Sequence, residues 1–368
     1  MPSPAVIAGM GAVTPVGLSA EATCAALRAG ISGLREVESF LVPGPLFDEV
    51  PVVGGRVPLE WFEGPPDEEE WPGHERFRAA EPPPPWALID PGPERLIDLA
   101  LPAVREAWGP PDLRPGKPRL GIYLGLPADE EAKPIISAIL EGLELKPLRA
   151  VAQPGGRASG LEVLHAALQD LAAGTVDLAL VGGVDSQLRG PALARLQAAG
   201  KLRTGENPQG VIPGEGAAFI VLAPETAGGD PNHPVNARIL SAATALEPTA
   251  STGDPNQAAG LSDVLRRVRE EAGLQAPPLV VCDLNGDRYR AMEWGLAATR
   301  VFGDLEGDLD FWHPADCMGD AGAALGVLNL IWGATAMTRE YSPRERVLVW
   351  GASENGVRGA VLMERANG

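Results

Sequence analysis

The sequence has few cysteines and no long apolar run, and both absences narrow the classes of protein to which it can belong. Only three cysteines occur in 368 residues, and an odd, sparse set is typical of reduced thiols in a cytosolic protein. No pair of them has the spacing of a metal site, so we expect no metal. No stretch approaches the roughly 20 apolar residues of a membrane helix, and the first residues do not resemble a signal peptide. We therefore expect a cytoplasmic protein that does not enter the membrane.

Basic residues are also scarce. Lys and Arg number 30 against 49 Asp and Glu, which gives a formal net charge of -19. Nucleic acid and anionic membrane are unlikely partners on this ground, since both need positive surface. An acidic protein partner would also be repelled, except at a local basic patch.

Apolar segments recur along the whole chain and alternate between strand-like and helix-like spacing. Residues 42–90 interrupt them with a Pro-rich, acidic stretch, for which we expect an irregular surface loop; a partner-binding role is the alternative. The opening strand is not followed by the G-x-G-x-x-G of a dinucleotide-binding helix, and no cofactor is expected. The pattern predicts helices over 19–27, 93–108, 158–174, 261–272, 289–300 and 319–332, and strands over 5–11, 119–125, 177–182, 213–222, 235–240 and 279–284, with a strand, turn and strand over 346–363.

The C-terminal part of the first half of the chain resembles the C-terminal part of the second half. The strand, glycine turn and strand over 346–363 match the pattern of residues 177–222, which indicates an internal duplication. We expect an N-terminal half of residues 1–227 and a C-terminal half of residues 228–368. Strands that alternate with helices predict an α/β protein with mainly parallel, buried sheets covered by helices.

Three segments carry a resemblance to a known family. The first is residues 151–186, which run into a helix and then into a strand that contains Gly182 and Gly183. The other two are Ile7–Gly17 and the Pro-Gly-Glu-Gly-Ala run from Pro213. They resemble the corresponding segments of β-ketoacyl synthases, condensing enzymes of the thiolase superfamily. This resemblance implies a thiolase-like fold, in which duplicated βα-rich halves form a five-layer αβαβα arrangement. The family's activity is that of a 3-oxoacyl-[acyl-carrier-protein] synthase, an acyltransferase.

The resemblance also implies that three catalytic positions of the family are changed. Counting back from the Gly-Gly strand places the family's nucleophilic cysteine on Arg157, and a guanidinium cannot form a thioester. The first family histidine corresponds to Asn285 and the second to Asp320. Residues that act as a unit do not compensate for one another, so we expect no ketosynthase chemistry.

Other reactive side chains offer no clear substitute for the nucleophile. Ser159 is expected to be a helix N-cap or a surface serine, and His165 a packed or surface histidine. Cys317 is expected to be a buried small residue, and Cys24 a core residue of the first helix.

Arg157 itself needs a partner, since a cation at a helix N-terminus opposes the helix dipole. We expect an ion pair with Asp320; Asp287 and Glu215 are the other candidates. A competing hypothesis is an anion site or pocket formed by Arg157, Ser159, Asp287 and Glu215 with the helix amides. A third hypothesis is that Arg157 is a solvated side chain that fills a vestigial pocket.

The segments at 182–186 and 213–216 also resemble those of chain length factors, cysteine-less subunits that pair with an active ketosynthase. That group usually has glutamine at the nucleophile position, so Arg157 departs from its pattern too. We expect a catalytically silent homologue that acts as a binding, partner or scaffold subunit in fatty acid or polyketide-type metabolism. Its expected partners are a second copy or a ketosynthase-like subunit, with an acyl carrier protein as a further candidate. The alternatives are an acyltransferase or hydrolase of acyl-carrier or CoA thioesters without a cysteine nucleophile, and an adaptor or chaperone for a protein encoded nearby.

Overall fold

The strands form a large mixed sheet that folds into two leaves with the same strand order. The computed structural model describes residues 4–43, 49–58, 92–109, 118–225, 237–250, 252 and 254–366. The first leaf contains, in spatial order, β1 (Ala5–Val13), β7 (Glu215–Pro224), β6 (Leu178–Ser186), β4 (Leu120–Leu126) and β5 (Arg149–Pro154). The second contains β8 (Ala237–Leu246), β12 (Val357–Arg365), β11 (Arg346–Ala352), β9 (Leu279–Cys282) and β10 (Asp310–Trp312). A short antiparallel pairing of β1 with β8, from Ala5 to Ile7, joins the leaves.

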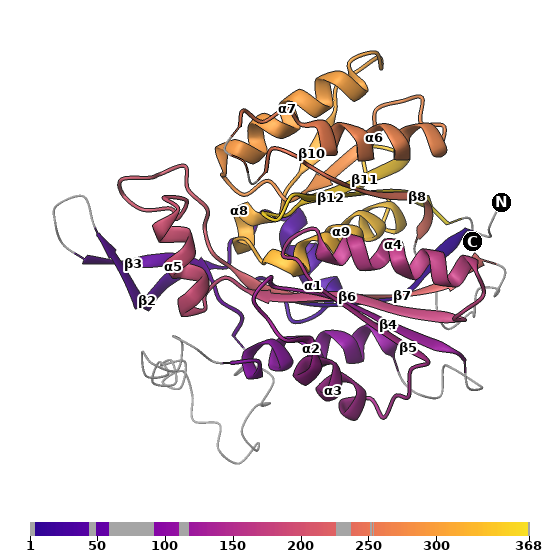
Figure 1. Cartoon of the computed structure of the whole chain (residues 1–368), viewed down its shortest axis with the longest axis horizontal. Coiled ribbons are helices and arrows are strands. Elements are labelled where there is room, and N and C mark those ends of the chain that lie inside the picture. The colour runs from indigo at the N-terminus through magenta and orange to yellow at the C-terminus, as the bar shows by residue number, and fades with distance from the viewer. Residues whose placement is uncertain are drawn as a thin grey trace.

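Helices form the other three layers (Figure 1). The central layer, between the leaves, contains α1 (Ala20–Arg28), α4 (Ser159–Ala172) and α9 (Leu325–Thr338). The outer face of the first leaf is covered by α2 (Glu94–Trp108) and α3 (Ala132–Gly142), and that of the second by α6 (Ala259–Glu271) and α7 (Arg288–Phe302). The chain therefore has the predicted five-layer αβαβα arrangement.

Smaller elements lie beside these layers. They are the antiparallel pair β2 (Leu34–Pro43) and β3 (Glu49–Gly55), helix α5 (Gly190–Ala198), helix α8 (Ala315–Met318) and a 3-10 helix over Gly322–Ala324. No described helix is long and apolar enough to cross a membrane.

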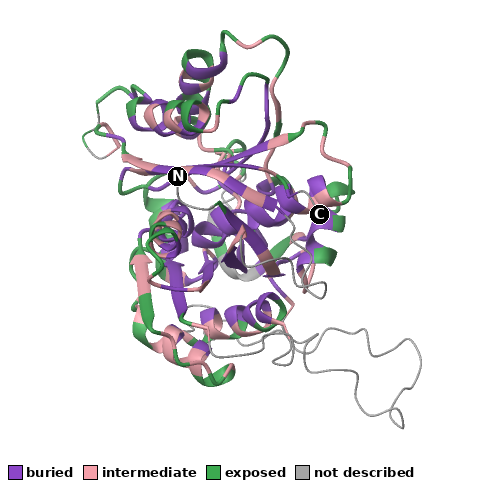
Figure 2. Cartoon of the chain, turned by 90° about the vertical axis from the view of Figure 1, so that its right-hand side faces the viewer, coloured by how far each residue is buried: buried purple, intermediate pink, exposed green. Residues whose placement is uncertain are grey.

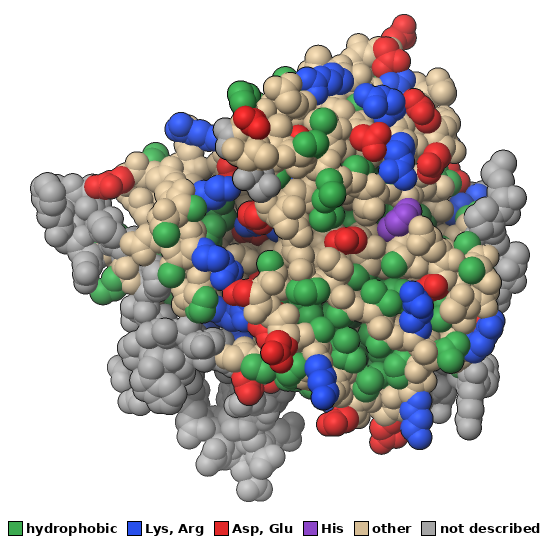
Figure 3. All heavy atoms as spheres, viewed as in Figure 1, with side chains coloured by type: hydrophobic (Ala, Val, Ile, Leu, Met, Phe, Trp, Pro, Cys, Tyr) green, Lys and Arg blue, Asp and Glu red, His purple; other side chains and the backbone are tan. Residues whose placement is uncertain are grey.

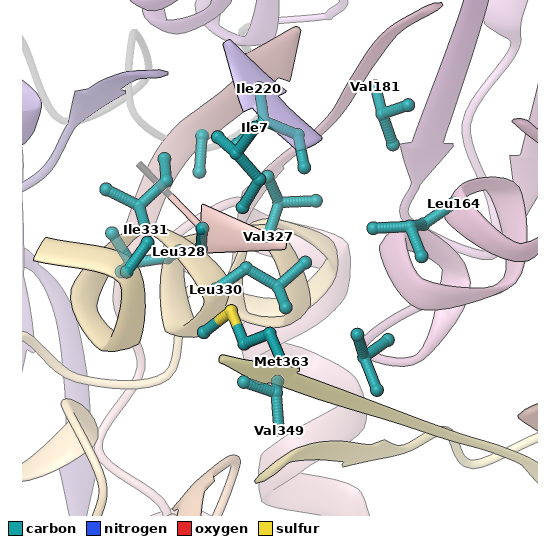
Figure 4. Packing of buried hydrophobic residues seen from close by; sticks show 14 of the residues in the cluster. Ile7, Leu164, Val181, Ile220, Val327, Leu328, Leu330, Ile331, Val349 and Met363 are labelled. Carbon is teal, nitrogen blue, oxygen red and sulfur yellow. The ribbon is translucent and has the colours of Figure 1, made fainter. Parts of the chain in front are cut away.

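The largest hydrophobic cluster fills the space between the leaves. Figure 4 shows how its side chains converge from both leaves and from the central helices. The contributing residues include Ile7, Val181 and Ile220 from the first leaf, Val349 and Met363 from the second, and Leu164, Val327, Leu328, Leu330 and Ile331 from α4 and α9. The helices of this layer are buried on most sides, and Figure 2 shows the exposed residues gathered on the outer helices and loops. This packing holds the N-terminus of α4 and the segment before α9 against each other.

Most predicted elements are confirmed, and the differences have physical causes. The sheets are mixed and not mainly parallel, because β11 and β12 are joined by a tight turn and β1, β7 and β8 also pair antiparallel. The α-helix predicted over 319–332 begins only at Leu325, since Gly319 and Gly322 have positive φ, which a regular α-helix does not accommodate, and Gly322–Ala324 form a 3-10 helix. Residues 49–55 form a strand although irregular structure was expected. Most of the remaining range to residue 90, and the half boundary at 227/228, lie outside the described residues.

Candidate functional site: a buried charge cluster

The candidate site forms where loops from both leaves meet at the N-terminus of α4. The turn after β5 contains Arg157, the loop after β9 contains Asn285, and the turn after β11 contains Glu354. The backbone N–H of Ala158 donates to Ser353 Oγ at 2.8 Å, which ties the start of α4 to the β11–β12 turn. Residues that are distant in sequence are thereby brought into one buried cluster.

Arg157 lies two residues before α4 begins, and its side chain is 5% exposed. Its Nε donates to Asp320 Oδ2 at 2.7 Å, and the guanidinium forms a second ion pair with Glu354. Burial by itself lowers the pKa of Arg157, but the carboxylates of Asp320 and Glu354 hold that pKa above its ordinary value. Arg157 is therefore a permanent buried cation, and its predicted pairing with Asp320 is confirmed.

Asp320 is fully buried and bonded through both carboxylate oxygens. Oδ2 accepts from Arg157 and from the side-chain amide of Asn285, and Oδ1 accepts the backbone N–H of Gly322 at 2.9 Å. Its own N–H donates to the carbonyl of Ile212, which fixes it against the segment that leads into β7. The structure thus brings together the three residues that the sequence places at the family's catalytic positions. Their correspondence to those positions stays a prediction.

A second arginine extends the cluster. Arg290, on α7, donates to Asp283 Oδ2 at 2.9 Å and to Glu354 Oε1 at 3.0 Å. Glu354 therefore receives both guanidinium groups on one oxygen, while its side chain remains 56% exposed. Desolvation opposes ionisation, yet Arg157 and Arg290 hold the pKa of Glu354 well below its usual range. We call this set the charge cluster: Arg157, Arg290, Asp283, Asp320, Glu354 and Asn285.

Asp287 and Glu215, the other candidate partners of Arg157, have different partners. Asp287 pairs with Lys201 at 2.7 Å, and Glu215 pairs with Arg95. The expectation that either could neutralise Arg157 is wrong, because each is engaged elsewhere.

Ser159 and Cys317 also differ from their expected settings. Ser159 is the first residue of α4 and is fully buried, so it is neither an N-cap nor a surface serine. Its hydroxyl donates to the carbonyl of Gly156. Cys317 is half-buried, whereas Cys24 is buried on α1 as expected. An anion site formed by Arg157, Ser159, Asp287 and Glu215 stays a prediction, although Ser159, Asp287 and Glu215 each have other partners in the structure.

A small cavity of about 200 Å³ opens beside Glu354. Its lining includes Lys201, Tyr289, Arg290, Glu293, Ser353 and Glu354. Three polar atoms on these residues are buried and have no hydrogen-bond partner among the described residues: Tyr289 Oη, Arg290 Nε and Glu293 Oε2. The described ranges contain no group of three His, Cys, Asp or Glu side chains that could hold a metal ion.

The polar groups at the centre of the charge cluster are engaged with one another. A guanidinium offers only donors, and the Asp320 carboxylate is already saturated by donors. Cys24 and Cys282 are core thiols whose pKa is raised by desolvation, Cys24 to about 12. Neither belongs to the charge cluster, and His165 contacts Gln169 on the surface of α4.

Comparisons with known proteins agree with this fold. Residues 150–227 match the model of the β-ketoacyl synthase N-terminal domain. No curated protein matches the sequence. Among solved structures, the ketosynthase from module 6 of the bacillaene synthase of Bacillus subtilis 168 is 18% identical, with a TM-score of 0.76 over 99% of this chain and 72% of that chain.

Two further structures match over the full length of both chains. One is a type II polyketide synthase acyl-carrier protein in complex with its ketosynthase, at 13% identity and a TM-score of 0.78. The other is the ishigamide ketosynthase/chain length factor, at 18% identity and a TM-score of 0.76. The architecture is that of the thiolase-like ketosynthases. The family model covers residues 150–227 only, so these comparisons show a shared fold.

The sequence analysis missed Arg290, Asp283 and Glu354. Arg290 lies on a helix with no motif around it, so nothing in the sequence separates it from a surface arginine. Glu354 had a weak signal, because it follows Ala352-Ser353 in the glycine-rich turn near the C-terminus.

Proposed function

We propose that the chain is a catalytically silent ketosynthase homologue that acts as a binding, partner or scaffold subunit in fatty acid or polyketide-type metabolism. The observation that carries this proposal is the burial of Arg157, fully ion-paired, at the N-terminus of α4. A condensing enzyme needs a thiolate at that helix end, where the dipole lowers its pKa. A cation held in the same place serves neither as nucleophile nor as general base.

The groups around Arg157 support the same conclusion. Decarboxylation of a malonyl thioester needs donors directed at its carbonyl oxygen. The carboxylate of Asp320 is an acceptor, and the amide of Asn285 already donates to it. A thioester carbonyl would therefore meet negative charge where catalysis requires a donor.

The exposed edge of the first leaf supports a role in pairing with another subunit. Strand β5 ends the strand order of the described sheet, and its central residues are only half-buried. In Figure 3, hydrophobic side chains gather on the face over β4, β5 and β6. An unpaired edge of this kind is a template for adding a strand from another chain. We propose a homodimer or a heterodimer with a ketosynthase-like partner through β5, and an acyl carrier protein as a further partner.

The proposed lack of catalytic activity can be tested directly. The chain is incubated with acyl-carrier and acyl-CoA thioesters, and its intact mass and the products are analysed. We expect no acyl adduct and no thioester turnover above the buffer rate, while an active ketosynthase processes the same substrates in parallel. A stoichiometric adduct or sustained turnover would overturn the proposal. Affinity purification from the native host is expected to recover a ketosynthase-like subunit or a second copy of the chain.

A further inference from the structure

Glu354 places its carboxylate between two buried arginines. Arg157 and Arg290 approach from different elements, and each side chain is only 5% exposed, yet both donate to the same oxygen of Glu354. We propose that these two arginines form a binding site for a small polar carboxylate compound, and that Glu354 fills this site until the ligand displaces it.

Of the three carboxylates in the charge cluster, Glu354 is the one that can leave. Asp320 and Asp283 are buried and also accept backbone N–H groups, from Gly322 and Ala352 respectively. The Glu354 side chain is 56% exposed, and its partners within the charge cluster are the two arginines. It lies in the short turn between β11 and β12, so its side chain can rotate into solvent without disturbing either strand. Each arginine would keep one aspartate partner during the exchange.

The adjoining cavity determines what else the ligand carries. At about 200 Å³ it has room for roughly six or seven water molecules, so a small compound would fill it. Tyr289, Arg290 and Glu293 line it, and each has a buried polar atom (Oη, Nε and Oε2) without a partner among the described residues. Buried polar groups are normally paired, so a ligand with hydroxyl or amino groups would complete them. A small hydroxy or amino acid anion has this combination of size and polarity.

The charge balance is preserved when a carboxylate replaces a carboxylate. The cluster holds two arginines and three carboxylates. The lowered pKa of Glu354 supports this, because it shows that the site favours the ionised form over the neutral acid. A neutral analogue of the ligand, such as an amide, should therefore fail to bind.

Titration of the full-length chain with glycolate, at constant ionic strength, tests the site by calorimetry. Glu354→Ala removes the internal competitor, so we expect glycolate to bind at least tenfold more tightly to this variant than to the wild type. Glu340→Ala is the matched control, because Glu340 is an exposed partner of Arg365 and its loss should change nothing. Glycolamide is expected to bind to none of the three proteins.

A second variant checks the contribution of the cavity. Tyr289→Phe in the Glu354→Ala background removes one hydroxyl and leaves the arginines intact, and we expect about three- to tenfold weaker binding. Equal affinity of glycolate for Glu354→Ala and wild type, or equal binding of glycolamide, would overturn the proposal. It does not rest on the proposed function, since a carboxylate site could exist on an active or a silent chain.

Discussion

Arg157→Met tests whether the ion pair with Asp320 holds the centre of the molecule together. The substitution keeps much of the side-chain volume but leaves the buried Asp320 carboxylate with hydrogen bonds only from Asn285 and Gly322. Removing one partner of a buried ion pair costs about 3–5 kcal/mol. For 368 residues the entropy of unfolding is about 0.8 kcal/mol per kelvin, so Tm should fall by about 4–6 °C.

A double-mutant cycle separates the ion pair from a simple loss of packing. Arg157→Met combined with Asp320→Asn removes both charges, and we expect it to recover at least half of the Tm lost in Arg157→Met alone. Thermal and urea unfolding give the four free energies. Arg365→Met is the matched control, since its exposed pair with Glu340 should contribute less than about 1 kcal/mol. A Tm for Arg157→Met within 1 °C of the wild type, or strictly additive effects, would refute the reasoning.

Three other predictions follow from separate features. Burial raises the pKa of Asp185 to about 6, so the ionised side chain destabilises the folded protein above pH 6 but not below about pH 4, where it is protonated. Asp185→Asn should therefore raise the free energy of unfolding, measured in urea, by about 1–3 kcal/mol at pH 7.5 and leave it unchanged at pH 4. Ala150→Glu places a charge on the exposed β5 edge and should reduce the mass in light scattering from two chains to one, whereas Ala198→Glu on α5 should not; a persistent dimer would contradict pairing through β5. Arg157→Cys should yield no condensation product by mass spectrometry, because Asp320 remains where a donor is needed; product formation would show that the nucleophile alone was missing.

The parts of the fold that follow local rules could be predicted from the sequence. Ser19 was expected to begin the first helix, and its Oγ accepts the N–H of Ala22 as the N-cap of α1. The β11–β12 turn was also predictable from its apolar runs and glycines. The β2–β3 pair was not, because its first strand mixes four polar residues with apolar ones without regular alternation and its second lies within a Pro-rich, acidic stretch that favours loops. Strand β5 was missed since it is short and only half-buried, and its sequence leads directly into a helix.

The candidate site was predictable only where a motif located it. Arg157 and Asp320 lie in segments with recognisable neighbours, so their contact could be expected. The carboxylate with which an arginine pairs otherwise depends on tertiary packing. From its sequence context, Asp287 was an equally good candidate for pairing with Arg157. Arg290 and Glu354 are 64 residues apart in the chain, and only the packing of α7 against the β11–β12 turn brings them together.

The position of β1 between the two leaves has a consequence for synthesis on the ribosome. β1 is complete after Val13, but its partners begin at Glu215 and Ala237. At a synthesis rate of about 5–20 residues per second, this apolar strand is unpaired for about 10–40 s before β7 is made. The core between the leaves needs still longer, since α9 comes near the end of the chain. The speed of translation thus sets how long an unpaired, aggregation-prone strand is exposed, and the inner face of the first leaf stays incompletely covered until α9 has been made.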